Sequence, residues 1–191
     1  MERLDGAASV PALLRGGIVA LGNFDGFHRG HQAVVGRAVT RARAEGRPAI
    51  VATFDPHPMR YFGPDTPSFR LTTLDQRQRL FAEAGADAML VFGFDAGLAG
   101  LSAREFADQR LIGLIGAGGV VTGADFTFGK GRDGDVTVLA ALGKVLGFST
   151  DTVQPVTDGP EPISSSRIRE ALQAGKPRDA AALLTRPFAI E

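Results

Sequence analysis

Short apolar runs alternate with longer helix-type segments along almost the whole chain. We expect strands in these runs, at residues 17–22, 49–54, 88–92, 120–122 and 149–154. Helices are expected between and after them, at about 29–45, 74–84, from 102 onward, 135–146, 165–174 and 179–184. Strands separated by helices favour a parallel sheet covered on both faces. The pattern predicts an α/β chain with a Rossmann-like, doubly wound parallel sheet of about five strands.

Two of the expected helices begin with a capping-box sequence. Thr73 is followed three residues later by Gln76, and Ser102 is followed by Glu105. In such a box the side chain of each residue bonds to the backbone N–H of the other. We therefore expect Thr73 and Ser102 to be N-cap residues.

Composition limits the classes of partner. A chain of 191 residues is long enough for one domain with a real core. Its net charge is zero and no apolar stretch reaches membrane-spanning length, so nothing indicates a nucleic-acid or membrane surface. The N-terminus, with Glu2, Arg3 and Asp5, does not resemble a signal peptide. The absence of cysteine excludes disulfides and thiol catalysis and permits a reducing compartment, so we expect a cytoplasmic protein.

The loop after the first strand carries the strongest functional signal. Residues 22–31, the histidine turn, read G-N-F-D-G-F-H-R-G-H between a buried strand and a helix. This arrangement presents backbone N–H groups and a helix N-terminus to a phosphate. His28 and His31 share one face of the first helical turn, and Gly30 lets a ligand approach the backbone closely. The turn predicts chemistry at phosphorus, at the sheet edge where ligands bind in such folds.

Other interpretations of the histidine turn are weaker. A histidine near a helix start is often only a cap or a satisfied structural residue. A histidine pair can also hold a metal, but zinc sites need further cysteine, histidine or carboxylate ligands, and this chain has neither cysteine nor an H-E-x-x-H sequence.

The third histidine lies directly after the second expected strand. His57 stands between Pro56 and Pro58 in the sequence T-F-D-P-H-P. Proline fixes its own φ and restricts the preceding residue, so this loop is stiff. It is either a rigid connector or one wall of a substrate pocket beside the histidine turn.

A glycine-rich loop follows the fourth expected strand. Residues 123–132 resemble a Walker A loop superficially, but the glycine spacing is one residue too long and Gly131 stands where Ser or Thr must hold Mg²⁺. The loop still ends a strand at the ligand edge. Phe128 in it is either a pocket residue or part of the core.

The sequence P-I-S-S-S-R-I-R at residues 162–169 opens a later helix. Serines are favoured N-caps, and a bare cap is the commonest meaning of such a run. Here Arg167 and Arg169 follow at once, and a guanidinium can bind two phosphate oxygens. Hydroxyls, a helix N-terminus and two guanidiniums together favour a triphosphate site.

Together these segments resemble a known family. The histidine turn is similar to the G-x-F-D-x-x-H-x-G-H signature of the HxGH nucleotidyltransferases. With T-F-D-P-H-P, G-A-D-F-T-F-G, I-S-S-S-R-I-R and L-L-T-R-P-F, the chain resembles the FMN adenylyltransferase module of bacterial bifunctional FAD synthetases over residues 17–188. It departs where Asp55 replaces Glu, Phe27 replaces Val and Ser166 replaces Thr. The riboflavin kinase domain that usually follows is absent, so we expect residues 1–191 to be one nucleotidyltransferase domain.

The resemblance implies the reaction ATP + FMN → FAD + pyrophosphate with Mg²⁺, by direct in-line displacement. It implies catalytic roles for His28, His31, Asn23 and Arg167. It implies ATP contacts from Gly22, Phe24, Asp25, Gly30, Gly123, Asp125, Ser164, Ser165, Ser166 and Arg169, and flavin contacts from Pro56, His57, Pro58, Phe62 and Phe128. The metal ligands are not identified.

Two rival functions stay open at this point. The chain could adenylylate another phosphate acceptor, such as phosphopantetheine or nicotinate mononucleotide, although the P-H-P loop and G-x-D-F-x-F-G argue against it. It could also be a nucleotide- or flavin-binding regulator without turnover, against which the intact histidines and serine–arginine sequence argue. A riboflavin kinase domain in a longer protein is the one macromolecular partner that the resemblance suggests.

Overall fold

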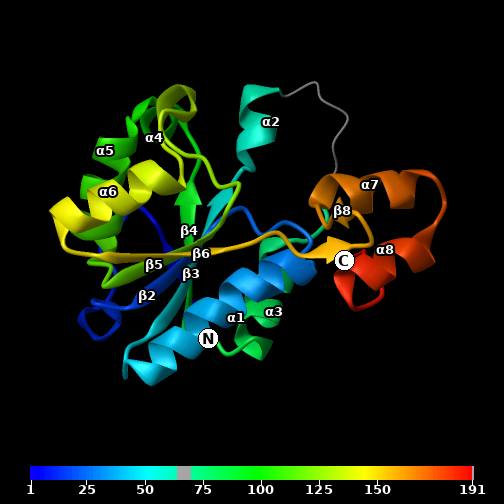
Figure 1. Cartoon of the computed structure of the whole chain (residues 1–191), viewed down its shortest axis with the longest axis horizontal. Coiled ribbons are helices and arrows are strands. Elements are labelled where there is room, and N and C mark those ends of the chain that lie inside the picture. Colours follow the sequence, from blue (N-terminus) through cyan, green and yellow to red (C-terminus); the bar gives the residue numbers. More distant parts are fainter. Residues whose placement is uncertain (64–69, 191) are drawn as a thin grey trace.

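A computed structural model describes residues 1–63 and 70–190 as a parallel sheet with helices on both faces (Figure 1). The strand order is β1-β4-β3-β2-β5-β6. The strands are β1 (Glu2–Asp5), β2 (Ile18–Leu21), β3 (Ala49–Asp55), β4 (Ala88–Gly93), β5 (Gly119–Gly123) and β6 (Ser149–Val153). The predicted fold class is confirmed, with one more strand than expected. Sequence reasoning missed β1 because its four residues include a single apolar one, Leu4, and it pairs along β4 at the sheet edge.

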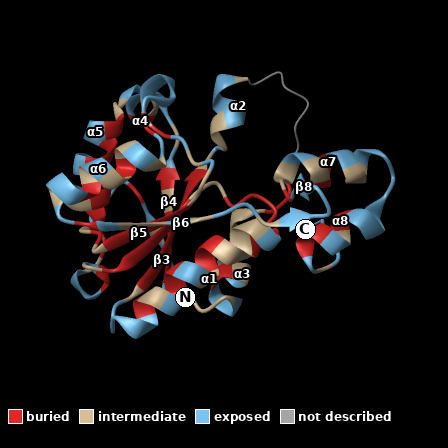
Figure 2. Ribbon diagram, in the orientation of Figure 1, coloured by how far each residue is buried: buried red, intermediate tan, exposed pale blue. Residues whose placement is uncertain are grey.

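Each face of the sheet has its own apolar core. One core packs strand residues such as Ala20 and Val51 against α1 (Arg29–Ala44) and α3 (Leu74–Glu83). The other packs residues such as Val19 and Leu90 against α4 (Ala96–Gly100), α5 (Ala103–Phe106), the π-helix η2 (Ala107–Ile115) and α6 (Val136–Leu146). Burial on both faces explains the continuous apolar runs of the central strands, which are red in Figure 2.

Both capping boxes form as expected. The Thr73 hydroxyl accepts from the backbone N–H of Gln76 at 3.1 Å, and the Gln76 side chain accepts from the Thr73 N–H at 2.8 Å. Ser102 and Glu105 make the corresponding pair at the start of α5. Two further short elements are η1 (Ala12–Leu14) and η3 (Lys130–Arg132).

The C-terminal segment forms a small lobe beside the sheet. It contains the hairpin β7 (Thr157–Asp158) and β8 (Glu161–Pro162), then α7 (Ser165–Gln173) and α8 (Pro177–Leu184), orange to red in Figure 1. The two helices are close to their predicted bounds, whereas the hairpin was not expected. A third, smaller apolar cluster that includes Leu71, Ile168 and Leu184 holds this lobe together.

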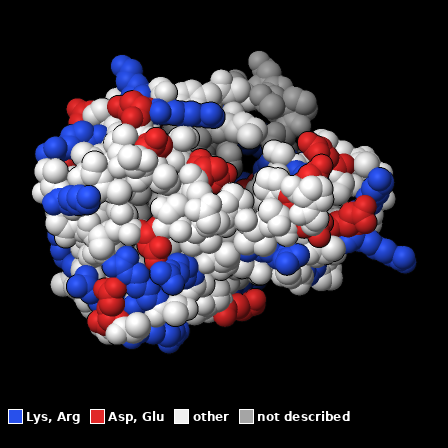
Figure 3. Space-filling view, viewed as in Figure 1, with Lys and Arg blue, Asp and Glu red and all other residues white. Residues whose placement is uncertain are grey.

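The order in which the chain adds strands to the sheet reverses between β2 and β5. These strands are neighbours, but the chain proceeds outward to β3 and β4 on one side and to β6 on the other. Loops that leave adjacent strands in opposite directions open a crevice at their carboxyl ends. Figure 3 shows a hollow between the sheet body and the C-terminal lobe, on a face where charges of both signs occur.

Within the described residues, no helix combines the length and the apolar sequence that a membrane span needs.

Candidate active site

A cavity of about 920 Å³ occupies the crevice at the carboxyl ends of the strands. It is lined by residues that follow five of the six strands: Asn23 after β2, His57 after β3, Phe94 after β4, Asp125 after β5 and Gln154 after β6. Its volume is typical of sites for small molecules. All three histidines line it, as the sequence predicts, so the two histidine clusters share one cavity.

His28 and His31 stack at the start of α1. Their ring centroids are 3.6 Å apart and the ring planes differ by 21°. His28 is the N-cap, and its Nδ1 accepts a hydrogen bond from the His31 backbone N–H at 3.4 Å. A neutral imidazole with an accepting Nδ1 carries its proton on Nε2. His28 can therefore donate one N–H to a ligand.

Burial keeps both rings of this pair neutral. Burial lowers the pKa of His28 to about 4, while the Asp25 carboxylate opposes the shift and Arg186 adds to it. The pKa of His31 is lowered well below its usual value by burial first and then by His28. The Nδ1 of His31 has no hydrogen-bond partner among the described residues. In the absence of ligand, the pair is a set of neutral donors and acceptors beside the cavity.

The histidine turn contains backbone that non-glycine residues rarely adopt. Phe24 and Phe27 have φ values of 50° and 42°, and Gly26 has a φ of 86°. Such strain persists only where neighbouring groups hold the chain. Arg186 is one of these neighbouring groups. Its guanidinium donates hydrogen bonds to the carbonyl of Gly26 at 2.7 Å and to that of Phe27 at 3.3 Å. Sequence reasoning gave Arg186 no role, because its partners lie about 160 residues earlier.

Asp25 does not line the cavity but forms a buried ionic centre behind it. Its carboxylate is 2% exposed and accepts from Arg77 at 3.0 Å, from Arg169 at 2.5 Å, and from the backbone N–H groups of Leu71 and Thr72. Burial alone would raise the pKa of Asp25, but these cations and N–H groups outweigh burial and hold the pKa below its usual value. Arg77 was missed from the sequence, where it reads as an ordinary helix-surface residue.

The serine–arginine sequence divides between the cavity and other partners. Ser164 and Ser165 line the cavity. The Ser164 hydroxyl caps α7, and the Ser165 hydroxyl donates to the Asp25 carbonyl at 2.8 Å. Ser166 is exposed and outside the cavity wall. The guanidinium of Arg167 contacts Asp158 at 3.1 Å and Glu161 at 3.4 Å on the β7–β8 hairpin, so neither arginine of the sequence lines the cavity.

Aromatic side chains form the opposite wall of the cavity. Phe126 and Phe128 stack with centroids 5.6 Å apart, and Phe128 also packs on Phe106. Phe128 is 7% exposed and belongs to the apolar core, and it also lines the cavity. It is therefore both a core residue and a pocket residue, the two alternatives that the sequence left open. Phe62, on the short helix α2 (Pro58–Phe62), is 69% exposed and packs on Phe94 at 5.7 Å. Sequence reasoning did not single out Phe54, Phe94, Phe106 or Phe126, which also line the wall.

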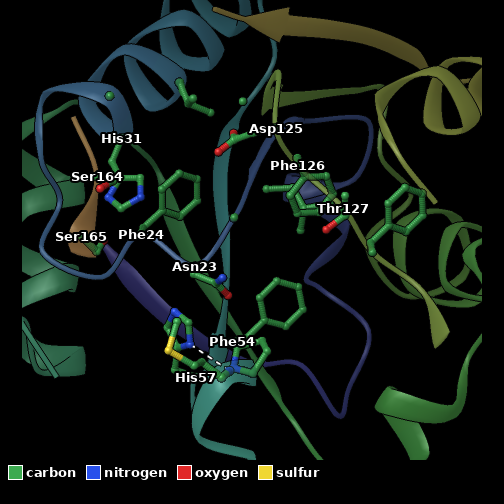
Figure 4. A pocket seen from close by; sticks show the side chains of 18 of the residues that line it. Asn23, Phe24, His31, Phe54, His57, Asp125, Phe126, Thr127, Ser164 and Ser165 are labelled. Atoms are coloured by element: carbon green, nitrogen blue, oxygen red, sulfur yellow. Dashed lines mark hydrogen bonds between the residues drawn. The ribbon is translucent and has the colours of Figure 1, made fainter. Parts of the chain in front are cut away.

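His57 connects this wall to the polar part of the site. Its Nδ1 accepts from the Met59 N–H at 3.1 Å, which caps α2, and burial lowers its pKa (Figure 4). Pro58 lines the cavity, whereas Pro56, joined to Asp55 by a cis peptide bond, does not. Figure 4 labels the side chains of Asn23, Phe24, His57 and Asp125, which all line this one cavity.

Glycines bring the backbone close to the polar part of the cavity. Gly22 directly follows β2, Gly123 is the last residue of the neighbouring strand β5, and Gly30 lies in the first turn of α1. A Cβ on Gly30 would lie 3.1 Å from the His28 ring. These positions therefore suit close contact with a ligand, and a side chain at Gly30 would require the His28 ring to shift by a few tenths of an ångström.

Comparisons with known proteins agree on one family. The family model for FAD synthetase matches residues 10–167. The bifunctional riboflavin kinase/FMN adenylyltransferase of Escherichia coli K12 is 37% identical over 175 residues, which is 92% of this chain and 56% of the relative. The protein of that name from Bacillus subtilis is 38% identical and covers 91% of this chain and 55% of the relative. The chain thus spans about half the length of these curated relatives.

A solved structure supports the fold. A Streptococcus pneumoniae protein described as a macrolide-efflux protein superposes with a TM-score of 0.85 at 27% sequence identity. The match covers 97% of this chain and 60% of that one. The architecture of the sheet, the helices and the C-terminal lobe is therefore shared with an experimentally determined structure.

Proposed function

Because this chain belongs to the FAD synthetase family, we propose that it transfers AMP from ATP to FMN and releases FAD and pyrophosphate. The observation that carries the proposal is one continuous cavity that joins a strand–turn–helix phosphate site to an aromatic wall. The polar end suits the phosphates of two substrates, and the aromatic end suits a flat isoalloxazine ring. The names of the relatives indicate the same chemistry for those proteins.

The proposed reaction is a single in-line displacement. A phosphate oxygen of FMN forms a bond to the α-phosphorus of ATP, and the bond from that phosphorus to the bridging oxygen of pyrophosphate breaks. The FMN phosphate is already an anion at neutral pH, so the step requires no general base. The protein contributes position and stabilisation of charge.

The polar side chains of the cavity supply this stabilisation. The N–H on Nε2 of His28, the His31 ring and the Asn23 amide would donate to oxygens of the α-phosphate as charge develops there. Ser164 and Ser165 would bind the leaving pyrophosphate at the start of α7. Neutral imidazoles can perform this task, because each carries one N–H that can donate a hydrogen bond to a phosphate oxygen.

The Asp125 carboxylate of the cavity wall fits a magnesium ion brought by the nucleotide. No group of three carboxylates or histidines among the described residues could hold a metal by itself, and Asp125 is the sole carboxylate that they contribute to the cavity wall. Mg²⁺ needs only one or two protein carboxylates when substrate phosphates complete its shell. Bound there, it would neutralise phosphate charge, with Asp125 as its protein ligand.

An assay with four candidate acceptors tests the proposed function. The purified chain is incubated with ATP and Mg²⁺ and with FMN, riboflavin, phosphopantetheine or nicotinate mononucleotide, and products are separated by chromatography. We expect FAD from FMN and no product from riboflavin, which has no phosphate to act as nucleophile. Adenylylation of another acceptor in place of FMN, or no turnover with tight flavin binding, would refute the proposed function in favour of one of its rivals.

We also propose that residues 1–191 act as one nucleotidyltransferase domain and that the protein is cytoplasmic.

A further inference from the structure

The cavity holds few cations for the ligands that it is proposed to bind. ATP and FMN both carry several negative charges at neutral pH. Of the described residues that line the cavity, Arg132 alone is a lysine or arginine. Arg167 contacts the hairpin carboxylates and Arg169 contacts buried Asp25, so both sequence-predicted cations are directed elsewhere. The three lining histidines have lowered pKa values. The positive charge of the cavity wall therefore rests on Arg132.

Arg132 is held in a conformation that glycine would adopt more easily. Its φ is 60°, and Gly129 and Gly131 in the same turn have φ values of 79° and 65°. A side chain in this left-handed region crowds its own carbonyl, which glycine avoids. An arginine at such a position on the wall of a cavity favours a role for its side chain rather than for its backbone.

The turn that carries Arg132 is fixed on both sides. The Arg132 N–H donates to the Gly129 carbonyl at 3.0 Å, and the Lys130 N–H donates to the Leu101 carbonyl at 2.7 Å. Asp133 then accepts from the Ala103 N–H at 3.1 Å. The guanidinium itself makes no hydrogen bond or ion pair with another described residue. The backbone is thus anchored to α5 while the charged group stays available to a ligand.

We infer that Arg132 binds a phosphate group of a substrate in this cavity. A guanidinium can form two parallel hydrogen bonds to phosphate oxygens, and these charge-assisted bonds are strong. The phosphate comes either from FMN or from ATP, and the two sources are separated by measuring each ligand alone. This inference rests on the proposed function for the identity of the ligands.

Binding measured without turnover tests the inference. Arg132→Gly removes the guanidinium and relaxes the left-handed backbone, so the melting temperature should not fall. Dissociation constants for FMN, riboflavin and ATP are determined by calorimetry or flavin fluorescence. We expect roughly 10- to 100-fold weaker binding of FMN or of ATP, the effect of one charge-assisted hydrogen-bond pair, and unchanged binding of riboflavin. Loss for FMN identifies the flavin phosphate, and loss for ATP identifies the nucleotide.

Two comparisons make the test specific. Lys130→Ala removes the same charge from the same turn, at a residue that does not line the cavity, and should leave all three dissociation constants unchanged. Arg132→Lys keeps the charge but cannot form the two parallel hydrogen bonds of a guanidinium, so it should bind the phosphate ligand with intermediate affinity. Unchanged affinity for both FMN and ATP in Arg132→Gly, an equal loss for riboflavin, or an equal loss in Lys130→Ala would each overturn the inference. Failure of the proposed function is distinct, since it would appear as no FAD from the wild-type chain.

Discussion

The carboxylate of Asp25 accepts a hydrogen bond from Arg169 at 2.5 Å, across 144 residues of sequence. This contact joins the histidine turn to helix α7, which carries Ser164 and Ser165. The Ser165 hydroxyl reinforces the same junction through the Asp25 carbonyl. The two segments proposed to bind opposite ends of a triphosphate are therefore fixed relative to each other by a buried ion pair.

Loss of the Asp25 charge should destabilise the fold severely. Asp25→Asn removes the carboxylate charge that pairs with the buried guanidinium of Arg77 and also contacts Arg169, and removing one partner of a buried ion pair costs about 3–5 kcal/mol. Urea unfolding should show a decrease of this size in the free energy of unfolding. Asp158→Asn is the matched control, because Asp158 pairs with Arg167 at the surface and such pairs contribute about 0–1 kcal/mol. Equal stability of the two variants would contradict this assignment.

His28 should act mainly in the transition state. His28→Asn keeps a favoured N-cap for α1 but removes the Nε2 donor, so the helix start is preserved. We expect kcat for FAD formation to fall roughly 10²–10³-fold, the effect of losing one preorganised donor, with little change in the dissociation constant for ATP. Single-turnover kinetics and calorimetry measure the two quantities separately. Near-normal kcat with weaker ATP binding would contradict the catalytic role.

The free protein should lose stability in mild acid. The pKa of His28 is about 4 in the folded chain and 6.5 in its reference state, so between these values the unfolded chain binds a proton that the folded chain does not. Unfolding thus becomes more favourable as pH falls from about 6.5 to about 4, by at most about 1.4 kcal/mol per pH unit for this group. Melting curves at pH 7, 6 and 5 should show this decline. The slope should be smaller in His28→Asn, and an unchanged slope would refute the contribution of His28.

Arg186 should be a positioning residue for the histidine turn. The guanidinium of Arg186 donates two hydrogen bonds to the carbonyls of Gly26 and Phe27, and their loss would leave the strained backbone of the turn less firmly held. For Arg186→Ala we expect a larger loss in kcat than in ATP or FMN affinity, with partial recovery in Arg186→Lys. Arg178→Ala, an exposed change on α8, is the control and should behave like wild type. A purely structural role would lower the melting temperature of Arg186→Ala while leaving its kcat intact below that temperature.

Sequence by itself determined the features that depend on near neighbours. The strands are apolar runs, the capping boxes at Thr73 and Ser102 are bonds between residues three apart, and the helix bounds follow from such local signals. The position of the histidine turn at the ligand edge also follows, because a parallel sheet places every strand–helix loop there.

Tertiary structure alone decided which way the charged side chains turn. Asp25 and Arg169 read as nucleotide ligands in sequence, yet each is buried against a partner from a distant segment, and Arg167 turns to the hairpin. Arg186 lies in the L-L-T-R-P-F segment and Arg132 in the glycine-rich loop, but the sequence indicated a role for neither. One contacts carbonyls about 160 residues away, and the other lines a cavity closed by several loops. An arginine side chain is long enough to reach in several directions, and only the packed fold determines where a carboxylate or a carbonyl lies within its reach.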